Sequence, residues 1–176
     1  MDLNGNRIIA ADRQTVWKAL NNAEVLQASI PGCTELTGTP EDGFEAVVTQ
    51  KVGPVKATFK GSVTLADIVE AESYRLNGAG KGGAAGFAKG GAVIRLKDVE
   101  GGTNLMYEVE AKVGGKLAQL GSRVVHGVAV KVASQFFENF EMIVALPKEA
   151  VDEVEEEKSE KGWFGKLLDW IKSLTG

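Results

Sequence analysis

The feature of this sequence that most constrains its fold is a change of hydrophobic period at Gly114-Gly115. Before this point, apolar and polar residues alternate over residues 55–69 and 103–113, as in antiparallel strands with one covered and one exposed face. After it, apolar residues recur about every 3.6 positions as far as Pro147, which indicates a helix. We therefore expect a sheet followed by one continuous helix over residues 117–146, on the order of 40 Å long.

The rest of the chain gives the order of the other elements. A first strand is expected over residues 2–10. A short helix should begin at Asp12, and a second, over residues 23–30, should end before Pro31-Gly32, because proline restricts the residue before it. Further strands are expected over residues 44–52, 55–69, 73–80, 86–98 and 103–113. This order predicts an α+β helix-grip fold, as in START-like and Bet v 1-like proteins. In that fold a curved antiparallel sheet wraps around the long C-terminal helix, with an apolar cavity between them.

Inward-facing residues of the predicted sheet and helix are candidates to line this cavity. They are core residues first, but small residues such as Ala57, Ala111 and Gly127 leave space among them, which favours a cavity of ligand size. Phe87 is placed at the tip of a glycine-rich segment over 78–91, which is either a flap over the cavity mouth or an inert hairpin. The candidate cavity residues are Phe59, Gly61, Val63, Phe87, Leu105, Tyr107, Val109, Leu120, Val124 and Val128.

No residue pattern indicates catalysis or a metal site. Cys33 and His126 are the only cysteine and histidine, so they do not supply a metal site of the usual type. Glu108 and Glu110 fall on the outward parity of their strand, unlike an acid–base pair in a cleft. Residues 78–83 match the G-x-G-x-x-G string of dinucleotide-binding proteins, but strand patterns lie on both sides of it and no helix follows. We expect no enzyme activity, no metal and no covalent cofactor.

Charge divides the chain into two parts. Residues 1–147 hold 16 acidic and 15 basic residues, so this part is nearly neutral and predicts no binding of nucleic acid. Seven acidic residues fall within 148–160, which lacks an apolar stripe and is expected to be a solvated linker. The predicted organisation is a domain over residues 1–146, an acidic linker over 147–160 and a helix over 161–176.

The last of these segments is predicted to lie on a membrane surface. Its apolar residues recur at spacings of three and four, so a helix would carry one broad apolar face and one basic face. At roughly 22 Å this helix is too short to span a bilayer, and tryptophan and lysine favour the interface. The alternative is docking onto its own domain or a partner protein. The predicted membrane-binding residues are Lys161, Trp163, Phe164, Lys166, Leu167, Leu168, Trp170, Ile171, Lys172 and Leu174.

Four stretches of the chain resemble the CoxG family of carbon monoxide dehydrogenase accessory proteins, which belongs to the START-like (SRPBCC) superfamily. They are Ile30-Pro31-Gly32-Cys33, Lys51-Val52-Gly53-Pro54-Val55-Lys56, Phe59-Lys60-Gly61, and the glycine-rich run from Gly80 to Gly90. The resemblance covers residues 1–146 and implies an accessory protein. Its implied role is to recruit a molybdenum-containing carbon monoxide dehydrogenase, or a related molybdenum hydroxylase, to the membrane and to couple the enzyme's electrons to the quinone pool.

Together with the predicted cavity, the resemblance implies a bound quinone or another isoprenoid lipid. The hydroxyl of Tyr107 is a candidate hydrogen-bond donor to a quinone carbonyl. The expected partners are the molybdenum hydroxylase, the membrane surface and the apolar small molecule. Two alternatives stay open, a pure membrane-recruitment adaptor without a ligand and a cyclase- or lyase-type enzyme using the same cavity. The first residues lack a signal-peptide pattern, and no apolar run reaches transmembrane length, so we expect a cytoplasmic protein at the inner face of the cell membrane.

Overall fold

The protein is described here by a computed structural model, in which residues 1–145 are placed. The predicted acidic linker and amphipathic helix, residues 147–176, lie outside the described residues. Within residues 1–145, no helix is both long enough and apolar enough to cross a membrane.

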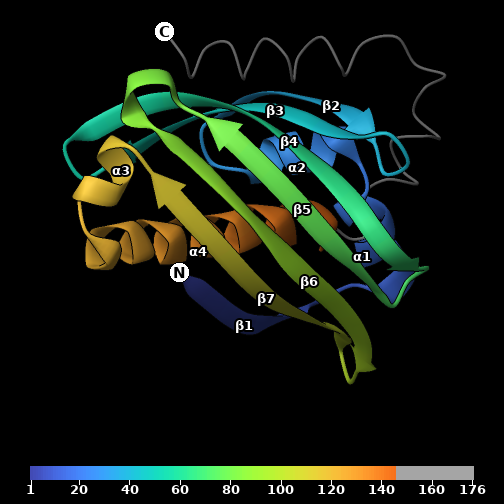
Figure 1. The fold of residues 1–176 in the computed structure, drawn as a ribbon. Helices are drawn as coiled ribbons and strands as arrows, with labels where there is room; N and C mark the ends of the chain where they lie inside the picture. Colours follow the sequence, from blue (N-terminus) through green and yellow to red (C-terminus); the bar gives the residue numbers. More distant parts are fainter. Residues whose placement is uncertain (146–176) are drawn as a thin grey trace, which may run out of the picture. The chain divides into compact units, whose positions relative to one another are not determined.

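A seven-stranded antiparallel sheet forms most of the domain and curves around the last helix (Figure 1). The strand order is β1-β7-β6-β5-β4-β3-β2, so consecutive strands from β2 to β7 pair with each other and β1 pairs with β7. The strands are β1 (Asp2–Ile9), β2 (Cys33–Thr39), β3 (Gly43–Val52), β4 (Val55–Val69), β5 (Ser73–Lys81), β6 (Phe87–Val99) and β7 (Gly102–Gly114). The predicted helix-grip fold is confirmed, and the predicted strands are all present. The edge strand β2 is an addition to the predicted set.

Two short helices connect β1 to β2. Helix α1 (Arg13–Leu20) begins where the Asp12 carboxylate accepts a 3.0 Å hydrogen bond from the Thr15 backbone N–H, as predicted. Helix α2 (Ala23–Ser29) is capped in the same way by Asn22 and ends before Pro31, also as predicted. The Asn139 side-chain amide donates a 3.1 Å hydrogen bond to the Ser29 carbonyl and so joins α2 to the last helix.

The expected continuous helix over 117–146 is wrong at its start. A single-turn helix, α3 (Lys116–Gln119), is followed by a break, and the long helix α4 occupies Ser122–Val144. Gly121 causes the break, because its φ of +88° lies in the left-handed region that glycine adopts without a steric penalty. The apolar stripe runs through the break, so hydrophobic period alone did not reveal it. Helix α4 has 23 residues and is about 34 Å long.

Candidate functional site

The concave face of the sheet has a filled half and an open half. The C-terminal half of α4 fills its part with aromatic side chains, since Phe137 and Phe140 are buried and Phe136 packs edge-to-face on Phe137 at 5.2 Å between ring centroids. Helix α1 adds Trp17, which meets Tyr74 edge-to-face at 5.3 Å. This cluster is the hydrophobic core of the domain. It occupies the end of the sheet that includes the β4–β5 and β6–β7 turns.

The open half contains a hollow of about 390 Å³ on the concave face of the sheet. Its walls are apolar, and the inward-facing positions that form them belong to five neighbouring strands, β3 to β7. These inward-facing lining residues are Ala46, Val48, Phe59, Gly61, Val63, Leu76, Gly78, Gly80, Ala88, Gly90, Ala92, Val109 and Ala111. The volume falls within the range of small-molecule sites, about 300–1,000 Å³.

The hollow exists because many of the inward-facing residues there are glycine or alanine, which have no side chain or only a methyl group. Glycines face each other directly across strands, in the pairs Gly61↔Gly80 and Gly78↔Gly90. The same strand β5 carries the buried Tyr74 at its other end, on the same inward parity. The concave face therefore changes from large to small residues along each strand, and packing stops where the small residues begin.

The N-terminal half of α4 is less covered by the rest of the domain than its C-terminal half. Val124 and Val130 are each 40% exposed, whereas Phe140 near the other end of the helix is fully buried. Gly127, between them, has no neighbour within contact distance of the position that a β-carbon would occupy. An apolar helix surface that stays exposed in the monomer is available to a ligand or a partner.

Four of the ten predicted cavity residues line the hollow together. Phe59, Gly61 and Val63 come from β4, and Val109 comes from β7. The alternation of the two strands predicted their inward direction correctly, and the exposed and covered positions alternate along β4 as expected. Whether these residues bind a ligand stays a prediction.

The structure places the other six predicted cavity residues away from the hollow. Leu105 is 1% exposed and belongs to the core, because its part of β7 lies under the C-terminal half of α4. Tyr107 stacks on Phe137 at 5.1 Å, and its hydroxyl lies over Gly5 of β1, not over the hollow. Leu120 lies between α3 and α4, and Val124 and Val128 lie on α4. Phe87 is exposed on the outer face of the sheet, where it packs against Gly114.

The small residues of β5 and β6 are the lining that the sequence interpretation missed. Gly78, Gly80, Ala88 and Gly90 fall in the segment 78–91 that was interpreted as a flap or hairpin, and Ala92 was not named as lining. All five continue the strand parity of Tyr74 and the inward positions of β6. Alternation of small with polar residues was the signal that could have identified them. The actual turn is confined to a short 3₁₀ helix, η1 (Gly83–Ala85).

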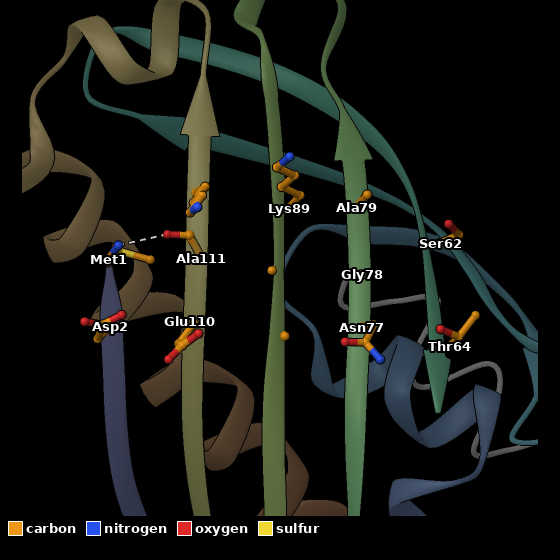
Figure 2. A pocket seen from close by; sticks show the side chains of 13 residues that line it. Met1, Asp2, Ser62, Thr64, Asn77, Gly78, Ala79, Lys89, Glu110 and Ala111 are labelled. Atoms are coloured by element: carbon orange, nitrogen blue, oxygen red, sulfur yellow. Dashed lines mark hydrogen bonds between the residues drawn. The ribbon is translucent and has the colours of Figure 1, made fainter. Parts of the chain in front are cut away.

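A second hollow, of about 630 Å³, lies on the outer face of the same strands (Figure 2). Figure 2 shows Thr64, Asn77, Lys89 and Glu110 at this face, and the Met1 amino group donates a 2.9 Å hydrogen bond to the Ala111 carbonyl at its edge. The outer hollow thus carries polar side chains, whereas the inner one is almost entirely apolar. Several residues line both, among them Gly78, Gly90 and Gly91.

The two hollows are separated at these glycines by backbone alone. A β-carbon on Gly90 would lie 2.1 Å from the Glu110 carbonyl oxygen, which excludes any side chain there. The close approach of β6 and β7 at this point requires glycine and keeps the wall of the inner hollow thin.

Titratable side chains do not converge on the inner hollow. Burial raises the pKa of the Tyr74 hydroxyl and of the Cys33 thiol, and neither residue lines the hollow. Glu110 borders it, but the side chain is exposed on the outer face, and His126 is exposed on α4. Within residues 1–145, no three His, Cys, Asp or Glu side chains come together as metal ligands. The arrangement suits binding of an apolar molecule better than acid–base chemistry.

Comparison with known proteins gives a family match over most of the chain. The sequence model of the CoxG family, described as a subunit of carbon monoxide dehydrogenase, matches residues 5–145. A solved structure of a conserved protein from Geobacillus kaustophilus is 31% identical, covers 82% of this chain and 95% of its own, and superimposes with a TM-score of 0.76. No curated protein matches this chain.

More distant structures share the fold alone. An uncharacterised protein from Rhizobium leguminosarum is 14% identical, with coverage of 82% of this chain and 94% of its own and a TM-score of 0.65. A protein from Thermus thermophilus is 13% identical, with coverage of 82% and 97% and a TM-score of 0.62.

Proposed function

This chain belongs to the CoxG family of carbon monoxide dehydrogenase, and we propose that it is a non-enzymatic accessory protein that carries an apolar small molecule for such a dehydrogenase. The partner enzyme is a molybdenum-containing carbon monoxide dehydrogenase or a related molybdenum hydroxylase. The cargo is a quinone or another isoprenoid lipid, and the protein links the enzyme to the membrane quinone pool.

The observation that carries this proposal is the apolar hollow of about 390 Å³ on the concave face of the sheet, lined by β3 to β7. An apolar wall without inward-facing charges favours a hydrocarbon body, because a polar ligand would lose its hydrogen bonds to water without replacement. Phe59 and Val63 offer ring and branched surfaces, and Gly78 and Gly80 expose backbone to which a flat or extended molecule can lie close.

Hydrogen bonding to a quinone carbonyl needs a donor other than Tyr107. The Tyr107 hydroxyl lies over Gly5, so it does not reach the hollow. We propose that the residues of the hollow hold the apolar part of the cargo and that its specificity comes from shape. A cyclase- or lyase-type enzyme is disfavoured, since such chemistry needs titratable groups directed at the ligand.

Membrane attachment is proposed for the segment 161–176, which lies outside the described residues. Co-sedimentation of the full chain with anionic vesicles tests it, alongside a chain ending at Pro147 and the double variant Trp163→Ala/Trp170→Ala. We expect the full chain to sediment with vesicles and both altered chains to sediment less. If all three stay in the supernatant, the segment does not attach the protein to a membrane.

The cargo is tested by mass spectrometry of lipid extracted from the purified full chain. We compare the wild type with Ala88→Leu, whose side chain enters the hollow, and with Ala79→Leu as a matched control. The backbone of Ala79 borders the hollow, but its side chain lies on the outer face of the neighbouring strand. We expect a bound isoprenoid lipid in the wild type and control and a marked loss in Ala88→Leu.

Two results would change the proposal. Absence of any bound or exchangeable apolar molecule in the wild type would leave a pure recruitment adaptor. Equal lipid content in Ala88→Leu and the wild type would place the cargo outside the hollow.

A further inference from the structure

Positive charge gathers at one end of the domain, at the turns beside the open half. Figure 1 shows the β3–β4 turn, the β5–β6 connection with η1, and α3 at this end of the sheet. Helix η1 packs against β4 and α3, and the turn at Gly53 lies against Val124 at the start of α4. We call the exposed cations on these segments the basic end. They are Lys51, Lys56, Lys60, Lys81, Lys89, Lys112, Lys116 and Arg123.

The turns of the basic end and the chain next to them carry no carboxylate side chain. Residues 46–66, 73–97 and 111–137 contain no aspartate or glutamate. Seven acidic residues gather in the turns at the opposite end of the sheet, namely Glu41, Asp42, Asp67, Glu70, Glu72, Asp98 and Glu100. On the outer face between the two ends, Glu35 and Glu45 lie beside Lys60 and Lys81, and Glu110 lies beside Lys89 and Lys112. The near-neutral charge of the domain therefore hides a separation of charge along the strands.

The lysines of the basic end face one another across strands. The sheet register pairs Lys51 with Lys56, Lys60 with Lys81, and Lys89 with Lys112. Like charges directly opposite each other destabilise an antiparallel pair, so folding alone gives no reason for this arrangement. The ion pairs within residues 1–145 are Arg13–Asp98, Arg75–Asp67 and Arg95–Glu108. None of them includes a residue of the basic end.

Exposed apolar side chains lie among these lysines. Phe87 is 45% exposed, pairs across strands with Lys81 and packs on Gly114. Val124 is 40% exposed beside the β3–β4 turn, which Lys51 and Lys56 flank. Aromatic and aliphatic side chains set among lysines are typical of surfaces that enter the headgroup region of a bilayer.

The basic end also adjoins the inner hollow. Ala88 and Lys89 both line that hollow, and Lys89 is part of the basic end. An apolar cargo leaves a bilayer at lowest cost if its binding site approaches the lipid directly, without a passage through water.

We propose that the basic end docks on the surface of an anionic lipid bilayer, independently of the segment 161–176, and brings the hollow to the lipid. The proposal rests on the proposed function, because the hollow needs a lipid source only if it carries an apolar cargo. Charge complementarity supplies the attraction, and Phe87 and Val124 supply apolar contact. An acidic protein surface is the other occupant that lysines could meet, but it does not account for exposed apolar side chains beside an apolar hollow.

The test is co-sedimentation of the full chain with phosphatidylcholine vesicles that contain or lack phosphatidylglycerol. The variants are Lys60→Gln/Lys81→Gln and Lys89→Gln/Lys112→Gln. The control, Lys18→Gln/Lys97→Gln, removes the same charge from exposed sites outside the basic end. Each variant is also made with Trp163→Ala/Trp170→Ala, so that binding through the segment 161–176 does not mask the effect.

We expect each basic-end pair to weaken binding to phosphatidylglycerol vesicles by roughly 25-fold, at about fivefold per lysine, and the control to bind as the wild type does. Added salt should reduce the difference, because the Debye length shortens. Circular dichroism of each variant shows whether it is folded.

Equal binding by the basic-end variants and the control would overturn the proposal. So would unchanged vesicle binding together with weaker association with the purified dehydrogenase, which would make the basic end a protein-docking surface. Lipid content of the same preparations, measured by mass spectrometry, separates the two proposals. A protein without cargo that still needs the basic end for vesicle binding refutes only the carrier function.

Discussion

Filling the hollow from its own wall should stabilise the ligand-free protein. Ala88 lies on β6 opposite Gly80, which has no side chain, and Ala88 faces the inner hollow. The substitution Ala88→Leu adds three carbon atoms, which contribute about 2.4 kcal/mol if all of them are buried at ~0.8 kcal/mol each. Lost rotamer freedom and partial exposure reduce this value. We expect the free energy of unfolding to rise by about 1–2 kcal/mol.

Urea unfolding of the delipidated full chain, followed by far-ultraviolet circular dichroism, measures this change. The control Ala79→Leu places the same side chain on the exposed outer face of the neighbouring strand, where we expect a change within about 0.5 kcal/mol. With bound lipid the wild type should become more stable to urea than Ala88→Leu, because lipid binding adds to the free energy of unfolding of the wild type and the filled variant cannot bind it.

The opposite sign of the stability change would refute this reasoning. If Ala88→Leu lowers the free energy of unfolding by about 1–3 kcal/mol in the delipidated protein, the site behaves as an overpacked core. The hollow on the concave face of the sheet would then be filled in solution and could not hold a cargo.

Three further predictions concern the core, the basic end and the cysteine. Phe140→Ala should lower the free energy of unfolding by about 3–5 kcal/mol, whereas Met142→Ala, at a side chain 67% exposed, should change it by less than about 0.5 kcal/mol in the same urea titration. Lys89→Gln should raise stability by about 0.2–1 kcal/mol at low salt by removing repulsion from Lys112, and added salt should abolish the gain. Burial raises the pKa of the Cys33 thiol, so the rate of its reaction with a disulfide reagent should rise at higher pH than for a cysteine peptide. The stabilisation by the neutral thiol should be lost as pH rises through that raised pKa, and a profile matching the peptide would contradict both statements.

The fold could be predicted because local patterns and tertiary structure agree over most of the chain. The alternation in β4 and β7 fixed which residues face inward, and Asp12 and Pro31 marked helix ends through their backbone chemistry. Strand β2 was missed, since Cys33–Thr39 mixes polar and apolar residues without regular alternation and pairs on one side only. A single glycine, Gly121, broke the helix without interrupting its apolar stripe.

The site was harder to predict because strand parity does not say which half of a face is filled. Leu105 and Val109 share a strand and an inward direction, yet one lies in the core and the other lines the hollow. The difference depends on where the aromatic half of α4 crosses the sheet, which is a tertiary property. Large residues were therefore preferred as lining, whereas the real lining is mostly glycine and alanine.

The separation of charge was likewise hidden in the sequence. Lys60 and Lys81 are 21 positions apart, and only the register of β4 and β5 places them opposite each other. In a count over the whole domain, the positive charges of one end and the negative charges of the other cancel. A count by segment, joined to the predicted turns, would have revealed the basic end, because alternate turns of an antiparallel sheet lie at the same end.

Titration of a short-tailed ubiquinone into the delipidated full chain measures whether the hollow holds an apolar cargo. Amide nuclear magnetic resonance can follow the backbone glycines that form the wall, whose signals occupy a region of their own. We expect saturable shifts at Gly61, Gly78 and Gly80, with little change at Gly5 or Gly101, which lie outside the hollow. Absence of saturable shifts, or shifts that spare the wall glycines, would contradict the proposal that the hollow holds an apolar cargo.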